Sequence, residues 1–561
     1  MRRRLPKAEK LGYLFSPLYI LAPALERRLH PIYNREVNLL KILLLAAFLN
    51  GLSWIIIVPI WQYPDEQSHF GQIQYRAEKN GIPQSNTSYD TSYEVDLAEK
   101  VMGTQRDEGG NNKYTYHPEY KQPFSQNLSG PQEITIKNLP PQARSQMVKR
   151  EATLNPPLYY LAGAVVYKAF SASDLFTRVF AIRIMSLVIF MGTVVISFKI
   201  GQLIFKEKVL QLALPTVIAF KPMLVFASTG ILSDTLTIFM FSLFTLFSLK
   251  IIVHGFSVKN ALFILVSIIL GAMTRQNFLV VLFILPLLFI HQLLFAKKIR
   301  KPLIIAAIAG VAILYLASYF VPALDFIRRF DYPESSGYDP LNPLYHLNFL
   351  EHLKWTLNHT FREVWPWYWG IYKWLSLSLP HIIYQVINRL TILSAIGLIL
   401  GGVNVIRKRQ FKKEMPLLFV IAISFIYFAM ITAFDFLFRK NNGYSFGIQG
   451  RYFFPAIVSQ MAILLTGFWI LFTIILRKYA KVGIAAIIIL FFVFNFVSQF
   501  VVASSYYDTT NLQTFIIQAS QYKPGIFKGN IIIFILASSI ILQLIFLFKY
   551  LAYIIKENES H

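Results

Sequence analysis

The chain has 561 residues with a formal net charge of +25, and 55% of the residues are hydrophobic. This composition, with a mean hydropathy of +0.49, excludes an ordinary soluble protein. The positive charge is also typical of nucleic-acid-binding proteins, but here the basic residues gather in short segments between apolar stretches, so we exclude nucleic acid as a partner. The chain contains no cysteine, which excludes disulfides, thiolate metal sites and a cysteine nucleophile.

Apolar stretches of roughly 17 to 25 residues, the length that a helix needs to cross a bilayer, recur along the chain. They must be helical, because lipid offers no partner for a free backbone amide. We predict an all-α polytopic membrane protein with about 12 transmembrane helices. The predicted spans lie near 38–60, 176–200, 209–227, 234–253, 260–274, 277–296, 302–321, 385–405, 415–434, 453–476, 482–503 and 529–553.

The distribution of charge predicts the orientation. The segments that share a side with the basic N-terminus carry 28 Lys and Arg against 7 Asp and Glu, whereas residues 61–153 carry 10 against 12. Because cytoplasmic loops are enriched in Lys and Arg, both termini are predicted to be cytoplasmic. We expect the plasma (inner) membrane.

The predicted organisation follows from these spans. Its parts are a basic cytoplasmic N-terminus with an interfacial helix (1–37), the first transmembrane helix (38–60), a first large loop on the external side (61–175), transmembrane helices 2–7 (176–321), an aromatic-rich second large loop on the external side (322–384), transmembrane helices 8–12 (385–553) and a cytoplasmic tail (554–561).

The first large loop begins with a helix-like stretch, DEQSHFGQIQYRAEKNG, in which Pro64 precedes an acidic first turn. Most of the remaining loop is rich in Gln, Asn, Ser and Tyr without a clear period, so we expect an irregular structure, which by its size would select the acceptor. Residues 155–170, NPPLYYLAGAVVYKAF, are predicted as a helix at the outer interface. Counting them as a span would place the basic clusters KKIRK and RKRQFKK outside.

Acidic residues at the outer membrane edge are the first candidates for chemistry. Asp65 and Glu66 follow the first span directly, and His69 shares a helix face with Asp65. A partly desolvated carboxylate beside a histidine can be a general base or a metal ligand, although acidic residues in a first turn also stabilise the helix dipole. Asp234, in FASTGILSDTLTIF, begins a later span at the same edge, where helix capping is the alternative.

Three cations complete this set. Arg275, in GAMTRQNF, and Arg451, in GIQGRYFFP, lie at the outer ends of predicted spans, and Arg binds phosphate oxygens well. Pairing with a nearby carboxylate is their alternative role. Lys221 lies deeper, in the third predicted span, where its side chain could reach the interface. The aromatic run EVWPWYWGIYKW, from Glu363 to Trp374, is typical of an interfacial belt, with stacking on a sugar or an isoprenoid chain as the alternative.

Four motifs in a fixed order then resemble a known family: YPDEQSHF after the first span, NPPLYYLAG before the second, the STGILSD edge, and QGRYFFP before a late span. Together they resemble bacterial multi-pass membrane proteins with a PPDExxH-type motif, catalogued as a domain of unknown function. That family is similar to the GT-C class of membrane glycosyltransferases. The resemblance covers residues 38 to 553, but the motif reads YPDE here and no extended DxD cluster follows.

The resemblance implies a GT-C-like fold and roles for single residues. In GT-C enzymes a carboxylate in the first external loop acts as the base on the acceptor, and the donor is a sugar on a polyprenyl phosphate. Asp65 matches that carboxylate, with Glu66 beside it as a second catalytic candidate. Asp234 resembles an acidic position that helps some members to hold a divalent metal, so Asp65 and Asp234 are the predicted metal ligands. The residues expected to bind substrate are His69, Tyr159, Asp234, Arg275, Arg451 and Tyr452.

The sequence therefore predicts an inverting membrane glycosyltransferase that acts in cell-envelope glycan assembly. The predicted partners are a polyprenyl-phosphate hexose or pentose as donor, a hydroxyl on a glycan, lipid or protein acceptor, and the membrane lipids. A divalent metal ion is a possible cofactor. The alternatives are a transporter or flippase of lipid-linked glycans, which would place broken helices and ionisable groups near mid-membrane, and an assembly protein without chemistry.

Overall fold

The computed structural model describes residues 38–83, 89–107, 112–116, 124, 129–153, 155–296, 349–442, 447–509 and 511–559, together with single positions between 305 and 319. The predicted N-terminal interfacial helix and more than half of the predicted span 302–321 lie outside these residues.

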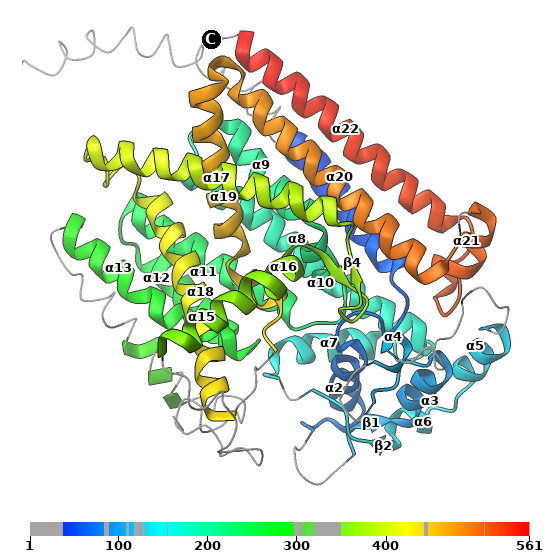
Figure 1. Ribbon diagram of the computed structural model, residues 1–561. Coiled ribbons are helices and arrows are strands. Elements are labelled where there is room, and N and C mark those ends of the chain that lie inside the picture. The colour runs from blue at the N-terminus through cyan, green and yellow to red at the C-terminus, as the bar shows by residue number, and fades with distance from the viewer. Residues whose placement is uncertain are drawn as a thin grey trace, which may run out of the picture.

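Eight helices in the described part of the chain are long and apolar enough to cross a membrane. They are Asn38–Ile57, α8 (Leu175–Ile204), α11 (Asp234–His254), α17 (His381–Arg407), α18 (Met415–Asn442), α19 (Ile457–Ile475), α20 (Ala480–Tyr507) and α22 (Ile531–Glu559), most of them labelled in Figure 1. Each overlaps a predicted span. The prediction of an all-α polytopic membrane protein is confirmed, but the number of twelve spans is not.

The predicted span 209–227 is broken. It consists of α9 (Lys208–Phe220) and α10 (Pro222–Thr229), which meet at an angle of 58°. Pro222 causes the break, because the residue before a proline is disfavoured in the helical region and Lys221 is extended, with φ −74° and ψ 106°. Two further predicted spans are short helices: α12 (Val258–Ala272) has 15 residues, and α13 (Val281–Ala296) follows a 3-10 turn, η2 (Gln276–Val280).

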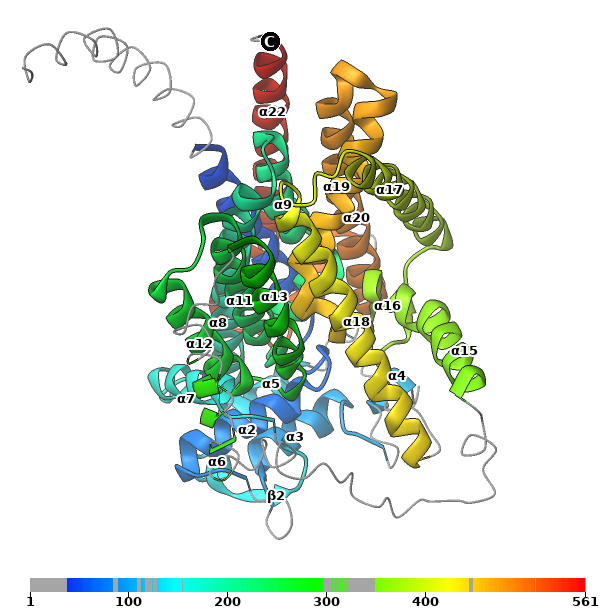
Figure 2. The ribbon, with the colours of Figure 1, turned by 90° about the vertical axis from the view of Figure 1, so that its left-hand side faces the viewer.

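The first large loop is more ordered than its composition suggests. It contains α2 (Glu66–Lys79), α3 (Tyr93–Met102), α4 (Lys113–Tyr116), α5 (Ser129–Lys137), α6 (Gln142–Ser145) and α7 (Leu158–Ala169), with an antiparallel pair of strands, β1 (Thr91–Ser92) and β2 (Met147–Lys149). Figures 1 and 2 show these elements packed together at one end of the molecule. The expectation of an irregular loop is wrong for these residues, because pairings between distant positions, such as Thr91 with Lys149, define the structure.

Two arginines of α8 tie this loop to the membrane helices. Arg178 is fully buried and pairs with Glu94 of α3, and it also donates to the Tyr167 hydroxyl of α7 at 2.5 Å. One helical turn further, Arg183 is also fully buried and pairs with Glu66. Buried charges require such partners, and the pairs fix the position of α2 and α3 over the end of α8.

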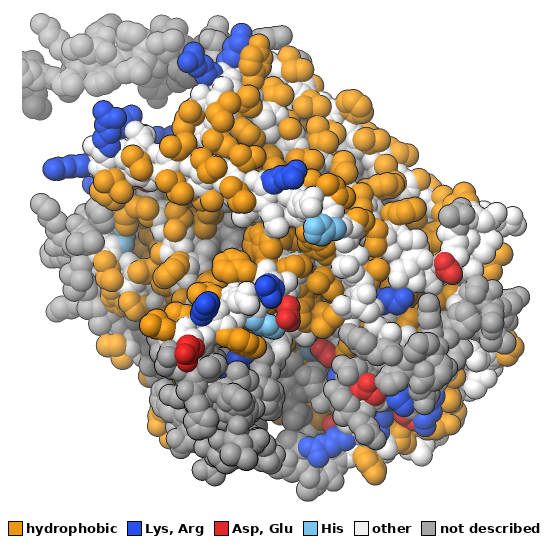
Figure 3. All heavy atoms as spheres, viewed as in Figure 1, with side chains coloured by type: hydrophobic (Ala, Val, Ile, Leu, Met, Phe, Trp, Pro, Cys, Tyr) orange, Lys and Arg blue, Asp and Glu red, His pale blue; other side chains and the backbone are white. Residues whose placement is uncertain are grey.

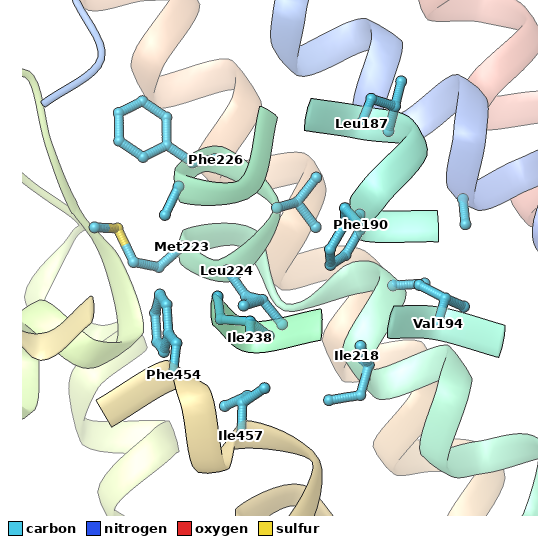
Figure 4. Close-up of a cluster of buried hydrophobic side chains, with 14 of the residues drawn as sticks. Leu187, Phe190, Val194, Ile218, Met223, Leu224, Phe226, Ile238, Phe454 and Ile457 are labelled. Atoms are coloured by element: carbon cyan, nitrogen blue, oxygen red, sulfur yellow. The ribbon is translucent and has the colours of Figure 1, made fainter. Parts of the chain in front are cut away.

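Apolar packing joins the spans around the broken helix. Figure 4 shows this cluster, which brings together side chains of α8, α9, α10, α11, α19 and the 3-10 turn η6 (Gly450–Ala456). Its labelled members are Leu187, Phe190, Val194, Ile218, Met223, Leu224, Phe226, Ile238, Phe454 and Ile457. On the outside, hydrophobic side chains dominate the face in Figure 3, whereas its acidic side chains lie toward the lower end. This distribution suits a surface in contact with lipid.

The described part of the second large loop lies against the membrane helices. It contains α15 (Phe349–His359), a π-helical turn η5 (Thr360–Val364), α16 (Trp365–Gly370) and a short hairpin, β3 (Ile371–Tyr372) with β4 (Leu377–Ser378). Lys221, at the break of the span, donates to the Tyr368 carbonyl at 2.5 Å and lies over the rings of Tyr368 and Trp369. The sequence suggested that the Lys221 side chain could reach the interface. In the structure this side chain is buried, so that interpretation is wrong.

Candidate active site

Asp65 lies in the turn between the first span and α2, at the position that precedes the helix. Its backbone has φ 55° and ψ 19°, the left-handed region, which a residue other than glycine rarely adopts and which is enriched at functional sites. Its side chain is 33% exposed and accepts hydrogen bonds from two arginines. Oδ1 accepts from Arg106 Nη2 at 2.8 Å, and Oδ2 accepts from Arg451 Nη2 at 3.1 Å.

The two arginines determine the charge state of Asp65. Burial by itself raises the pKa of a carboxyl group, but Arg451 and Arg106 outweigh burial and hold the pKa of Asp65 well below its usual range. The carboxylate is therefore ionised at neutral pH and is a hydrogen-bond acceptor only.

Asp234, at the start of α11, lies on the other side of Arg451. Its Oδ2 is 3.9 Å from Arg451 Nη1, and its Oδ1 pairs with Arg275. One guanidinium thus faces two carboxylates that are 169 positions apart in the sequence. Arg451 itself is 3% exposed, and its Nε and Nη1 have no hydrogen-bond partner among the described residues.

Tyr452 stands beside this cluster. The guanidinium of Arg275 lies 5.3 Å from the centre of its ring, and that of Arg451 lies 5.7 Å from it. The Tyr452 carbonyl accepts a hydrogen bond from the Tyr427 hydroxyl of α18 at 3.0 Å. The structure therefore brings together Asp65, Asp234, Arg275, Arg451 and Tyr452, which the sequence placed at the ends of four different spans.

Glu66 faces away from the cluster. Its two oxygens accept from Arg183 Nε at 2.7 Å and Nη2 at 2.6 Å, and Oε2 also accepts from the Trp61 amide at 2.9 Å. Arg183 donates in addition to the Val58 and Pro59 carbonyls, both at 2.9 Å. Glu66 is fully buried, so it offers no atom to a substrate, and this geometry fits an anchor of α2 better than the predicted catalytic role.

His69 lies one turn into α2. Its Nδ1 is 2.7 Å from the Tyr160 hydroxyl of α7, and the two rings are stacked with centres 5.8 Å apart. Burial lowers the pKa of His69 to about 3, although the charge of Asp65 opposes this shift. The imidazole is therefore neutral at physiological pH, and it is held in place by Tyr160.

Tyr159, a predicted substrate contact, is fully buried in the structure. Its hydroxyl lies 2.7 Å from the Ser186 hydroxyl of α8 and accepts from the Leu232 amide at 3.1 Å. It joins α7 to α8 and to the turn before Asp234. The neighbouring Tyr160, in contrast, contacts His69 of α2.

Sequence reasoning missed Arg106 and its partners. Arg106 Nε pairs with Glu151 Oε1 at 2.9 Å, and Glu151 pairs through Oε2 with Lys149 at 2.6 Å. Arg106 also lies 5.2 Å from the ring of Trp374 in the second large loop. No pattern in the irregular part of the first large loop indicated these residues. Arg183 did carry a signal, because a charged residue inside an apolar span requires a buried partner.

The residues present do not suit the predicted divalent metal. Asp65 and Asp234 are each paired with an arginine of their own, and Arg451 lies between them. No group of three or more His, Cys, Asp or Glu residues that could hold a metal ion occurs among the described residues. A hard dication requires six or more oxygen ligands and an excess of negative charge, whereas three guanidiniums here face two carboxylates.

An apolar cavity of about 330 Å³ lies next to the turn that carries Arg451. Trp365, Tyr368 and Trp369 of the aromatic run line it, together with side chains of α17, α18 and α19, and so does Phe453, two residues after Arg451. Tyr372, by contrast, is buried and stacks on Trp54 of the first span, with ring centres 5.6 Å apart. The aromatic run is therefore divided between a cavity wall and the core.

Comparisons with solved structures find two oligosaccharyltransferase structures and ArnT, all at low similarity. The archaeal oligosaccharyltransferase AglB from Archaeoglobus fulgidus, in complex with an inhibitory peptide and a dolichol-phosphate, has a TM-score of 0.42 and 11% identity over 85% of this chain and 56% of that chain. The apo form of the Archaeoglobus fulgidus oligosaccharyltransferase gives 0.43 and 13% over 85% and 57%. ArnT from Cupriavidus metallidurans gives 0.36 and 11% over 84% and 75%.

These likenesses are too distant to carry conclusions about activity, and the chain spans little more than half the length of the oligosaccharyltransferases. No curated protein matches the chain. A family model described as "Predicted membrane protein (DUF2142)" matches residues 48–460, which include the whole acidic and basic cluster. The chain therefore belongs to the DUF2142 family of predicted membrane proteins.

Proposed function

We propose that this protein is an inverting glycosyltransferase that moves a hexose or pentose from a polyprenyl-phosphate carrier to an acceptor hydroxyl, with Asp65 as the general base. The observation that carries the proposal is the pairing of Asp65 with Arg451. A carboxylate that is one-third exposed touches a buried arginine, and two nitrogens of that arginine have no hydrogen-bond partner among the described residues. Buried donors without partners are uncommon and point to a missing anionic ligand.

The phosphate of the donor supplies such a ligand. Arg451 Nε has no hydrogen-bond partner among the described residues and can donate to a phosphate oxygen, and Arg275, 18% exposed, lies near the same Tyr452 ring. Arginine forks match phosphate geometry, and fixed cations stabilise charge that develops on a leaving group. The apolar cavity of about 330 Å³, which shares the turn η6 with Arg451, suits part of the isoprenoid chain.

The proposed reaction is a single displacement. The acceptor oxygen gives its proton to Asp65 and forms a bond with the anomeric carbon. The bond between that carbon and the phosphate oxygen breaks, and its electron pair stays on the polyprenyl phosphate near Arg451 and Arg275. Attack from the side opposite to the leaving group inverts the anomeric configuration.

The charge state of Asp65 adds a condition to this mechanism. A carboxylate held by two arginines has a depressed pKa and is a weak base. Arg106 binds Oδ1 from an irregular part of the first large loop, whereas Arg451 belongs to the buried turn η6. We infer that the acceptor hydroxyl displaces Arg106 from Oδ1, which brings the pKa of Asp65 closer to that of an ordinary carboxyl group.

The test is sugar transfer by membranes that carry the full chain, with a panel of radiolabelled polyprenyl-phosphate hexoses and pentoses as donors. We expect Asp65→Asn to reduce transfer by about 10²- to 10⁴-fold, the usual range for loss of a general base. Glu363→Gln is the matched control, because Glu363 is 68% exposed in the second large loop, and it should leave transfer unchanged. Undiminished transfer by Asp65→Asn would exclude the proposed role.

The alternative, a transporter or flippase of lipid-linked glycans, is supported by one observation. The broken span places the buried Lys221 at the junction of α9 and α10, and discontinuous helices with buried ionisable groups are typical of transporter sites. Lys221 is occupied by the Tyr368 carbonyl and aromatic rings, however, and a structural role explains it. A flipping assay in liposomes without acceptor separates the two functions, because only a flippase moves the lipid-linked glycan there.

The acceptor, the cell-envelope role and the bacterial plasma membrane remain part of the proposal. A chain with eight to nine candidate spans among its described residues is an integral membrane protein, and the basic clusters favour cytoplasmic termini. That orientation places Asp65 and Arg451 on the non-cytoplasmic side.

A further inference from the structure

We propose that Arg451 replaces a divalent cation, so that the site between Asp65 and Asp234 operates without a metal ion. The inference rests on the proposed function only in its statement about sugar transfer. The structural claim is that a guanidinium fills the position between two carboxylates that a dication would occupy.

Arg451 bridges the two carboxylates. Arg451 Nη2 lies 3.1 Å from Asp65 Oδ2, and Arg451 Nη1 lies 3.9 Å from Asp234 Oδ2. The two terminal nitrogens of one planar group thus face different carboxylates. A cation that bound both carboxylates would have to lie in the same space, and Arg451 is buried on a turn that packs directly against the second large loop.

Both carboxylates also pair with further arginines. Asp65 has Arg106 as a further partner, and Asp234 has Arg275. Three guanidiniums thus lie against the two carboxylates, and one of them, Arg106, is shared with Glu151. A dication placed among them would be repelled by three positive charges and attracted by two negative ones.

A divalent cation between Asp65 and Asp234 would also lack further protein ligands. His69, the nearest other candidate ligand on α2, has its Nδ1 at 2.7 Å from the Tyr160 hydroxyl, and Glu66 is fully used by Arg183. In the described part of the chain, Asp65 and Asp234 thus stand without a third acidic or imidazole ligand. Two carboxylates completed by water make at most a weak site for Mg²⁺ or Mn²⁺, which cannot displace the guanidinium of Arg451.

The positive charge between the two carboxylates is therefore permanent, because Arg451 carries it. An arginine stays protonated at every physiological pH and does not exchange with the medium, unlike a bound ion. The Nε of Arg451, which has no hydrogen-bond partner among the described residues, then serves the anionic ligand directly, and transfer is expected to be independent of the concentration of divalent cations.

The experiment is Mn²⁺ binding to the purified, detergent-solubilised full chain, followed by electron paramagnetic resonance. The wild-type protein should bind no Mn²⁺ that Asp65→Asn or Asp234→Asn removes. In Arg451→Gln the two carboxylates lose their bridge and one cation, so we expect this variant to gain a Mn²⁺ site, and Arg451→Gln combined with Asp234→Asn to lose it again. Arg451→Lys, which keeps the charge, is the matched control and should bind no Mn²⁺.

Two results would overturn the inference: one equivalent of Mn²⁺ on the wild-type protein that depends on Asp65 and Asp234, or a folded Arg451→Gln variant that gains no Mn²⁺ site. If Arg451→Gln does not fold, the comparison of wild type with Asp234→Asn still decides the first question. Transfer in excess EDTA is the functional arm, and it should be unchanged. Absence of any transfer by the wild type would contradict the proposed function but would leave the Mn²⁺ result interpretable.

Discussion

Asp65 and Glu66 are neighbours in the sequence and have opposite environments. Glu66 is fully buried, and Arg183 holds both of its oxygens while itself donating to backbone carbonyls. Asp65 is one-third exposed, has a left-handed backbone and touches an arginine with two nitrogens that lack partners among the described residues. A charge pair with all of its hydrogen bonds satisfied stabilises a fold, whereas an incompletely satisfied one at an accessible position is typical of a site that binds a ligand.

The largest expected effect tests the anchoring side of this comparison. Glu66→Gln leaves the buried Arg183 without a countercharge, and removal of one partner of a buried pair typically costs about 3–5 kcal/mol of folding stability. We expect a clear drop in the thermal unfolding temperature of the detergent-solubilised protein.

Asp65→Asn is the matched control, because it changes the adjacent carboxylate by the same isosteric replacement. It should lower the unfolding temperature less than Glu66→Gln, since a third of the Asp65 side chain is exposed to solvent and Arg451 keeps Asp234 as a countercharge. Equal destabilisation by the two variants would remove the distinction between anchor and site.

A smaller effect is expected where the site meets the second large loop. A Cβ at Gly450 would lie 2.1 Å from the Tyr368 amide nitrogen, so Gly450→Ala must push the turn η6 away from α16. Overpacking of this kind costs about 1–3 kcal/mol, and because η6 carries Arg451, transfer should fall as well. Thermal unfolding and donor KM are the measurements.

Gly402→Ala provides the control for this substitution. Gly402 lies inside α17, and a Cβ there meets nothing within 4 Å. Alanine is the better helix former by about 0.5–1 kcal/mol, so this variant should be neutral or slightly stabilised. If Gly450→Ala has the unfolding temperature and donor KM of the wild type, η6 is not fixed by its contact with α16.

The smallest effect concerns the pH dependence of the site. Arg106 and Arg451 lower the pKa of Asp65 because they favour its charged form, so removal of Arg106 must raise that pKa. In Arg106→Gln the acid limb of kcat/KM should therefore move to higher pH. His69, whose pKa burial lowers to about 3, stays neutral and does not contribute a limb near neutral pH.

The measurement is kcat/KM as a function of pH for the wild type and Arg106→Gln. Lys100→Gln is the control, because Lys100 is 55% exposed and its ion pair with Asp96 does not include Asp65. An acid limb that stays in place in Arg106→Gln would mean that Asp65 is not the group whose protonation limits the reaction.

The sequence by itself determined the membrane character, the approximate positions of eight spans and the candidates at the outer edge. These properties depend on local composition: the length of an apolar run, the charge of a short loop, and an acidic or basic residue at the end of a span. The same information predicted that Asp65, Asp234, Arg275 and Arg451 lie at one membrane edge. The order of the spans and the charge of their loops determine on which side of the membrane each helix end lies.

Only the tertiary structure decided how these residues pair. Arg451 reaches both Asp65 and Asp234 because η6 packs beside the ends of the first span and α11, and no local pattern encodes that contact. The roles of Asp65 and Glu66 separate for the same reason, since Arg183 on α8 lies next to only one of them. The break at Lys221 was readable from Pro222, but the aromatic partners of Lys221 come from a loop almost 150 residues away, and they meet only when the chain folds.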